Sequence, residues 1–218
     1  MTRGLTDASQ DYLKEIYKLR MAGRRATTSA IAERLGVRPP SVTAMLKRLT
    51  TLGLAKHAPY RGVELTPAGE RVALEMIRHH RLLEQYLAQA LGLSLDEVHT
   101  EADRLEHALS EELEARIDHS LGYPTHDPHG DPIPNAKLRM ARASLRTLAS
   151  LEPGDEATIR RVPDGDDELL RYLAKLALVP GKKVKLSRAE PFGGPLTVRV
   201  GKSEHAISRE LAAGIGVA

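Results

Sequence analysis

Apolar residues recur with a helical period at several places along the chain. Residues 8–22 place leucine, isoleucine and tyrosine side chains on one face, which predicts an amphipathic helix that ends at the sequence GRRA. Two shorter helices are predicted next, in TTSAIAERLG and in VRPPSVTAMLKRLTTLG, each followed by a glycine. The short connection between them, which contains Gly36, is typical of a helix-turn-helix.

The pattern after Gly53 predicts a small β-hairpin and then a long helix. Two short stretches flank PYRG, whose proline and glycine suit a turn. Thr66 and Pro67 are typical of a helix start, and the apolar repeat continues to Gly92. The sequence SLDE at 94–97 is a capping box that begins another helix. Ser110 either continues that helix or caps a new one.

The last third of the chain changes to an alternating pattern. The stretches ATIRRV, KVKLSRA, LTVRVG and HAISREL alternate like strands, and Gly-Pro turns separate them. One short helix is predicted within DDELLRYLAKLALVPG. The sequence therefore predicts a small separate β domain, preceded by a segment at residues 122–135 that is either an ordered run of turns or a linker.

Charge is unevenly distributed. Residues 1–74 carry 13 Lys and Arg against 6 Asp and Glu, a net charge of +7, whereas residues 75–140 have a net charge of −7 and residues 141–218 of +3. A basic block suggests a polyanion as partner, and an acidic block suggests cations. Because charge scatter of this size also occurs by chance, it becomes informative only where motifs agree with it.

Composition limits the chemistry and the location. The chain has no cysteine, which excludes disulfides and iron–sulfur clusters and leaves His, Asp, Glu and backbone oxygen as metal ligands. It has no apolar run near 18 residues and no signal-like pattern at its N-terminus. We therefore expect a cytoplasmic protein without membrane contact.

The order helix, helix-turn-helix, hairpin is that of a winged helix, in which one helix enters the major groove and the hairpin lies on the DNA backbone. Polar side chains of the second short helix alternate with apolar ones, so they face away from the core. The alternative is a helical hairpin with a solvated basic face, but the hairpin and the positive charge favour DNA. The expected DNA contacts are Arg38, Pro39, Ser41, Thr43, Lys47 and Arg48, with Tyr60 and Arg61 at the hairpin tip.

Side chains that can bind metal gather in the acidic block. Asp103, Glu106 and His107 are spaced i, i+3 and i+4, which places them on one face of a helix. His80 and Glu84 are also four residues apart, as are His99 and Asp103. Such pairs are usually solvated, whereas carboxylate and imidazole on a shared face suit Mn, Fe or Zn.

Six segments carry a resemblance to a known family. DYLKEIYKL, IAERLGVRPPSVTAMLKRL, LTPAGE, HRLLEQYL, EADRLEH and HGDPIP occur in an order and spacing that resemble the diphtheria-toxin-repressor family of metal-dependent bacterial repressors, including its manganese-transport-regulator branch. The resemblance is close over residues 5–140. The last 70 residues look more loosely like that family's SH3-like, iron-transport-protein-A-like domain.

The resemblance implies two metal sites per subunit. The residues that fall on the family's primary site are Asp11, Asp103, Glu106 and His107. Those that fall on its ancillary site are His80, Glu84 and His99, with Asp166 as the best candidate from the C-terminal domain, followed by Asp167 and Glu168.

The resemblance also bears on which metal binds. Asp11 and Asp103 stand where the iron-responsive branch has Met and Cys, and hard oxygen ligands shift the preference towards Mn(II), with Fe(II) as the alternative. Lys14 stands where the manganese branch has a Glu, which argues against that branch's closely spaced two-metal cluster. The chain thus resembles a hybrid, with iron-branch architecture and oxygen-rich ligands.

The expected fold is mainly α (α+β). It comprises a winged-helix DNA-binding domain at 1–74, a helical dimerisation and metal-binding domain at 75–140, a linker at 141–150 and an SH3-like β-barrel at 151–218. We expect a homodimer that binds a double-stranded palindromic operator when metal fixes its geometry, and that controls metal-uptake genes. A stripe that is either dimer surface or intrachain core contains Leu82, Leu83, Tyr86, Leu87, Leu91, Leu105 and Leu109.

Two other functions compete with this one. A metallohydrolase would need an open coordination position, a general base and a substrate cleft, yet the sequence has no HExxH run, no nucleophile signature and no Gly-rich phosphate loop. We therefore expect neither an enzyme nor a small-molecule substrate. The second alternative is a winged-helix regulator that senses a small molecule other than a metal.

Overall fold

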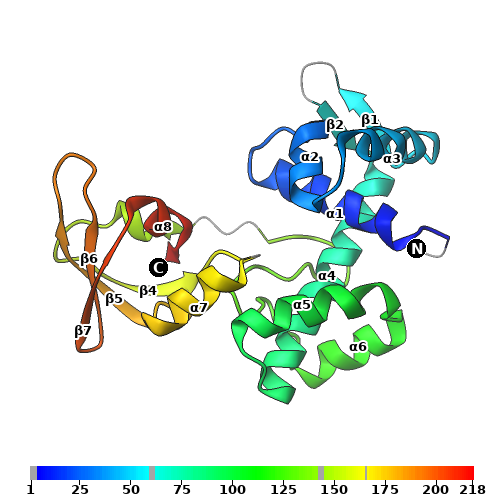
Figure 1. The fold of residues 1–218 in the computed structure, drawn as a ribbon. Helices are drawn as coiled ribbons and strands as arrows, with labels where there is room; N and C mark the ends of the chain where they lie inside the picture. Colours follow the sequence, from blue (N-terminus) through cyan, green and yellow to red (C-terminus); the bar gives the residue numbers. More distant parts are fainter. Residues whose placement is uncertain (1–3, 59–61, 142–144, 165) are drawn as a thin grey trace. The chain divides into compact units, whose positions relative to one another are not determined.

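The chain divides into two compact units. The computed structural model describes residues 4–58, 62–141, 145–164 and 166–218. One unit comprises Met1–His79 and Pro134–Met140, and the other comprises His80–Ile133 and Ala141–Ala218. The division falls inside helix α4 (Pro67–Leu91), so this one helix contributes to both units (Figure 1). The three-domain division expected from the sequence stays a prediction.

The first unit contains the predicted helix-turn-helix and hairpin. Its elements are α1 (Asp7–Met21), α2 (Thr28–Leu35), α3 (Pro39–Thr51), β1 (Ala55–Ala58), β2 (Gly62–Leu65) and the first part of α4. Strands β1 and β2 pair antiparallel as the wing. The expected DNA contacts Tyr60 and Arg61 lie outside the described residues.

Local signals in the sequence explain where these helices begin and end. The hydroxyl of Thr27 accepts the N–H of Ala30 at 3.1 Å and caps α2, and Gly36 ends that helix with a φ of 63°. Proline occupies the first turn of α3, where no intrahelical N–H is required. Thr66 caps α4 by accepting the N–H of Gly69.

The wing is fixed to the helices by backbone contacts. Val63 of β2 donates its N–H to the carbonyl of Ala26, just before α2, at 3.0 Å. Gly62 has a φ of 86°, and a Cβ there would lie 2.4 Å from the same Ala26 oxygen. Only glycine allows this approach. Beneath these contacts lies an aliphatic core whose buried members include Leu13, Ile16, Ile31, Val42 and Leu49.

The helical part of the second unit surrounds its own small core. It consists of the rest of α4, α5 (Leu95–Leu105), a 3-10 turn (Glu106–Ala108) and α6 (Glu111–Ser120). Ser110 caps α6 by accepting the N–H of Leu113, so the helix does break here and start again. Of the apolar stripe, Leu82, Leu83 and Leu87 are buried within the chain, whereas Leu91 is 61% exposed.

The last part of the second unit is a β-sheet with two short helices. Its elements are β3 (Arg146–Thr147), a 3-10 turn (Leu148–Ser150), β4 (Glu156–Arg161), α7 (Asp167–Lys175), β5 (Lys183–Ala189), β6 (Leu196–Val200), β7 (Ser203–Ile207), α8 (Arg209–Gly214) and β8 (Gly216–Val217). The strand order is β3-β8-β4-β5-β6-β7, with every pair antiparallel.

The expected small β domain is present, but its sheet does not close into the SH3-like β-barrel that the resemblance implied. Closure requires the two end strands to pair with each other. Among the described residues, β3 pairs only with β8 and β7 pairs only with β6, so the sheet is open. The buried face is aliphatic and includes Ile159, Val184, Leu186 and Val198.

Helix α4 is the longest element, with 25 residues, and it carries charged side chains along its length. Within the described ranges, every helix is either too short or too polar to cross a lipid bilayer.

Candidate metal centre and nucleic-acid interface

His80 on α4 lies at the centre of a cluster of carboxylates and imidazoles in the second unit. Its Nδ1 is 2.7 Å from Oε2 of Glu106 and 3.2 Å from Oδ1 of Asp103. Its Nε2 is 2.9 Å from Oε1 of Glu84 and 3.1 Å from Nδ1 of His99. The structure therefore brings together the three residues matched to the ancillary site and two of those matched to the primary site.

Helical spacing explains most of this convergence. His80 and Glu84 are one turn apart on α4, and His99 and Asp103 are one turn apart on α5. Glu106 lies where α5 passes into a 3-10 turn, but its backbone is still right-handed helical and its N–H donates to the carbonyl of Ala102. Asp103 and Glu106 therefore both reach Nδ1 of His80, although the side chain of Glu106 is 1% exposed and that of Asp103 is 48% exposed.

The electrostatics of the cluster favour a cation at its centre. Burial alone would lower the pKa of His80, but the surrounding carboxylates, Glu84 foremost, outweigh it and raise the pKa to about 10. Burial would raise the pKa of Glu84, but the charge on His80 holds it well below its usual range. In the metal-free chain a proton on His80 thus supplies the positive charge that buried carboxylates require.

A second group of ligand-capable side chains adjoins the first through Glu84. His129 is completely buried, and its Nε2 lies 3.1 Å from the carbonyl of Leu95. Its Nδ1 lies 3.7 Å from Oε2 of Glu84 and 3.9 Å from Oδ1 of Asp127, which is too far for a hydrogen bond. This Nδ1 has no hydrogen-bond partner among the described residues. A buried orphan nitrogen beside two carboxylates is a fitting position for a metal ligand.

The charges of this second group are strongly perturbed. Burial, together with the nearby Glu84 carboxylate, raises the pKa of Asp127 to about 7, although Arg81 opposes the shift. Burial would lower the pKa of His129, but the Glu84 carboxylate raises it to about 9. One ligand atom from each of Glu84, Asp127 and His129 lies within 4.8 Å of the others, as is true of His80, His99 and Asp103. Both groups offer only oxygen and nitrogen.

The other expected ligands are placed as follows. Asp11 is on α1 in the first unit, and its pairing with ligands of the second unit stays a prediction. His107 is in the 3-10 turn, with Nε2 3.7 Å from Glu106. Asp166 caps α7, where its carboxylate accepts the N–H groups of Glu168 and Leu169 at 3.0 and 3.1 Å. The ligand groups found among the described residues do not include it.

Sequence reasoning did not identify Asp127 and His129 as ligands. They lie in the turn-rich segment at residues 122–135, where no helical or strand period indicates which way a side chain points. Two signals in the sequence point to this segment: Asp and His residues are dense between His126 and Asp131, and His129 begins HGDPIP, one of the segments that carry the resemblance.

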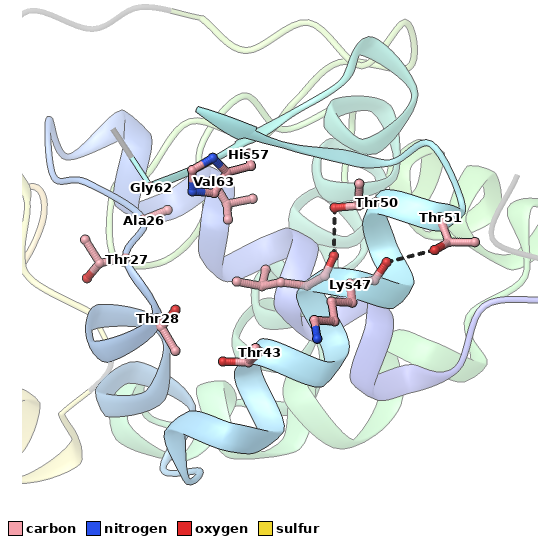
Figure 2. Close-up of a pocket in the computed structure, with 11 residues that line it drawn as sticks. Ala26, Thr27, Thr28, Thr43, Lys47, Thr50, Thr51, His57, Gly62 and Val63 are labelled. Carbon is pink, nitrogen blue, oxygen red and sulfur yellow. Dashed lines mark hydrogen bonds between the residues drawn. The ribbon is translucent and has the colours of Figure 1, made fainter. Parts of the chain in front are cut away.

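The expected DNA contacts on α3 are exposed. Val42 and Leu49 are buried on the opposite side of this helix, and a pocket of about 690 Å³ separates α3 from the start of α2 and from the wing. Across it, Thr43 and Lys47 face Thr27 and Thr28 (Figure 2). The exposed residues on α3 include Arg38, Pro39, Ser41, Thr43, Lys47 and Arg48.

The hydroxyls in this pocket are partly committed to the backbone. Thr43 donates to the carbonyl of Pro39 at 3.2 Å. Thr50 donates to that of Leu46 at 2.8 Å, and Thr51 to that of Lys47 at 3.1 Å (Figure 2). Lys47 is therefore the α3 side chain in the pocket with a charged donor to offer to an anion.

Comparison with known proteins finds a family match for most of this chain. Residues 4–63 match the N-terminal DNA-binding domain of the iron-dependent repressors, residues 66–135 match their metal-binding and dimerisation domain, and residues 146–218 match the FeoA domain. The iron-dependent repressor IdeR of Mycobacterium tuberculosis is 33% identical over 225 residues, which cover 98% of this chain and 97% of that protein.

Solved structures agree with this assignment. A manganese-dependent transcriptional repressor in complex with manganese has 37% sequence identity and a TM-score of 0.87, covering 96% of this chain and 98% of that one. The repressor ScaR with bound Zn²⁺ has 32% identity and a TM-score of 0.81, with the same coverage of both chains. The chain therefore belongs to the diphtheria-toxin-repressor family of metal-dependent transcriptional repressors.

Proposed function

We propose that Mn(II), with Fe(II) as the alternative, controls binding of this chain to operator DNA. The observation that carries the proposal is the convergence of three carboxylates on His80, of which those of Glu84 and Glu106 are buried. Because the donors are carboxylate and imidazole without any sulfur, the set suits a divalent first-row metal. The relatives above are named for iron or manganese dependence, which agrees with this donor chemistry.

We propose two ions per subunit, each held by a different set of ligands. One would be held by Asp103, Glu106 and His107, with Asp11 from α1. The second would be held at the group Glu84, Asp127 and His129, where the orphan Nδ1 of His129 supports a ligand role. His80 and His99 lie beside both sets and complete the ancillary site.

The proposed mechanism is a linkage between ion binding and domain orientation. Asp103, Glu106 and Glu84 would hold bound ions, whose charge would neutralise these carboxylates. His80 would then release to solvent the proton that it holds in the metal-free chain. Because Asp11 belongs to the winged-helix unit, its participation would fix the orientation of that unit relative to the dimerisation part.

The orientation of the winged-helix unit matters because the half-sites of a DNA duplex have a fixed spacing. In a homodimer, two recognition helices must match two half-sites of a palindromic operator. A tenfold gain in operator affinity needs about 1.4 kcal/mol of differential binding between the two states. The exposed face of α3 would contact the major groove, and the wing the neighbouring backbone. Genes for metal uptake are the expected targets.

The experiment that tests the proposal is a metal-titrated DNA-binding assay. Fluorescence anisotropy with a labelled promoter fragment should show tighter binding with Mn(II) or Fe(II) than with Co(II), Ni(II) or Zn(II) at physiological free concentrations, and loss of binding with chelator. Equal affinity in chelator and in excess metal would contradict it.

Two substitutions locate the effect. Asp103→Ala and His107→Ala should abolish the metal response while leaving the circular dichroism spectrum and the dimer unchanged. Glu101→Ala is a matched control, because Glu101 is a carboxylate of α5 that pairs with Arg104 instead of with the cluster. A normal metal response in both ligand variants would refute the ligand assignment.

A further inference from the structure

One segment of the chain connects the second ligand group directly to the winged-helix unit. It comprises residues 131–140, called the strap below. It follows the loop that carries Asp127 and His129, and it passes from the second unit to the first between Ile133 and Pro134. Neither the sequence patterns nor the proposed ligands assign it a role.

The beginning of the strap is attached to the ligand Asp127. Arg81 on α4 lies with its Nε 3.4 Å from Oδ2 of Asp127, and its Nη1 donates to the carbonyl of Pro132 at 2.6 Å. The other oxygen of Asp127 accepts the N–H groups of His129 and Asp131 at 2.9 and 3.0 Å. A single carboxylate therefore contacts the metal-binding loop, the start of the strap and the arginine that holds it.

The end of the strap is built into the first unit. Arg78, one turn before Arg81 on α4, donates to the buried carbonyl of Pro134 at 2.8 Å. Leu138 and Met140 pack against the hydrophobic core of the winged helix. Leu138 keeps a φ of 55°, an uncommon backbone conformation for a branched side chain that requires support from its surroundings.

Side-chain bonds also hold the turn between these two ends. The amide oxygen of Asn135 accepts the N–H groups of Lys137 and Arg139 at 2.9 and 3.1 Å. The backbone N–H of Leu138 donates to the carbonyl of Asn135 at 2.7 Å. Prolines at 132 and 134 further restrict the chain on both sides of Ile133. The strap is thus short, internally bonded and attached at both ends.

We propose that the strap transmits occupancy of the Glu84, Asp127 and His129 site to the winged-helix unit, with Arg81 and Arg78 as positioning residues. The proposal rests on the proposed function. An ion bound to Asp127 would compete with Arg81 and the loop amides for the same carboxylate. Because Arg81 also donates to the carbonyl of Pro132, the position of Pro132 would depend on whether the site is filled. Two prolines and a packed leucine restrict the conformations of the strap. A shift of Pro132 is therefore transmitted to the core that supports the DNA-binding helices.

The test is to detach the strap without altering a ligand. Leu138→Ala removes packing at the end of the strap, and Leu35→Ala is a matched control because Leu35 also packs, partly buried, against the same core. Two quantities are measured for the full-length chain. One is Mn(II) affinity and stoichiometry by calorimetry, and the other is operator affinity with Mn(II) divided by that with chelator.

The expected result separates coupling from binding. Leu138→Ala should bind Mn(II) within about twofold of the unsubstituted chain but lose at least about fivefold of the metal-dependent gain in operator affinity. Leu35→Ala should keep that gain, even if its overall operator affinity falls. A full metal-dependent gain in Leu138→Ala would overturn the strap proposal. No gain in the unsubstituted chain would instead overturn the proposed function.

A second measurement needs no substitution and so remains valid if Leu138→Ala fails to fold. Hydrogen exchange of the Leu138 and Arg139 amides in the unsubstituted chain should slow on addition of Mn(II). Arg81→Met, which leaves every ligand in place, should remove that protection while the Leu113 amide at the start of α6 is unaffected. Exchange at Leu138 and Arg139 that does not respond to Mn(II) would also overturn the proposal.

Discussion

His80 has four ligand-capable neighbours, and two of them were predicted to belong to a different metal site. The sequence predicted its partners Glu84 and His99 through the resemblance and helical spacing. Asp103 and Glu106 were assigned elsewhere, and their contacts with His80 emerge only when α4 and α5 pack together. Such a site stores its positive charge as a proton until a metal replaces it.

Metal affinity should therefore rise with pH. His80 and His129 have pKa values raised to about 10 and about 9, so both hold a proton at neutral pH in the metal-free chain. An ion must displace a proton from each histidine that it binds, which makes affinity increase about tenfold per pH unit for each proton released. Calorimetry of Mn(II) binding in buffers of different ionisation enthalpy measures this release. Affinity that does not change between about pH 6 and pH 8 would contradict the prediction.

The same shift has the opposite effect on the stability of the metal-free chain. The folded-state pKa of His80 is raised above its ordinary value of 6.5. Its contribution to the free energy of unfolding is consequently complete below about pH 6.5, and it is lost as the pH rises towards 10. Alkaline conditions thus weaken the empty cluster while they favour the filled one.

At the scale of elements, the starts of helices were predicted from the sequence better than their ends. The caps at Thr27, Thr66 and Ser94 are signals in adjacent residues, and each begins a helix in the structure. The change from α-helix to 3-10 turn after Leu105 has no glycine or proline to mark it, so the sequence did not predict it. Asp103 and Glu106 nevertheless both reach Nδ1 of His80, which agrees with their i, i+3 spacing on one helix face.

Helix α3 and its pocket yield a prediction about DNA. Lys47→Ala should weaken operator binding for any sequence and reduce the slope of log affinity against log salt by about 1, because one phosphate contact is lost. Arg71→Ala is the matched control, since Arg71 is exposed in the same unit on α4 and does not line the pocket. Anisotropy titrations over a range of salt concentrations measure both slopes. Equal slopes for Lys47→Ala and the unsubstituted chain would exclude Lys47 as a phosphate contact.

At the scale of the whole molecule, apolar residues that remain exposed are candidates for the contact with a second copy. The core of the second unit uses Leu82, Leu83 and Leu87, but it leaves Leu91 and Leu113 61% and 49% exposed. Members of this family carry a dimerisation domain, which matches residues 66–135 of this chain. Exposed leucines on that domain are therefore the natural candidates for the dimer contact.

Leu91→Glu should convert the dimer to a monomer. A carboxylate in a desolvated interface is unfavourable, and it would weaken association by about a hundredfold or more. Leu52→Glu is the control, because Leu52 is 49% exposed in the first unit. Sedimentation velocity at micromolar concentration distinguishes the two states. A Leu91→Glu protein that sediments as the dimer would place the interface elsewhere.

The sequence by itself determined the elements whose signals lie in neighbouring residues. These are the helix-turn-helix, the wing, the capped start of α4 and the donor types available to a metal, because caps, turns and periodicity act over a few residues. Tertiary structure alone decided the rest. Asp127 and His129 lie near Glu84 because of a loop without periodicity. The end of the strap belongs to the first unit, although helices α5 and α6 separate the two in the sequence. Whether the sheet closes depends on pairing between strands that are distant in sequence, which no local pattern encodes, and in the described residues it stays open.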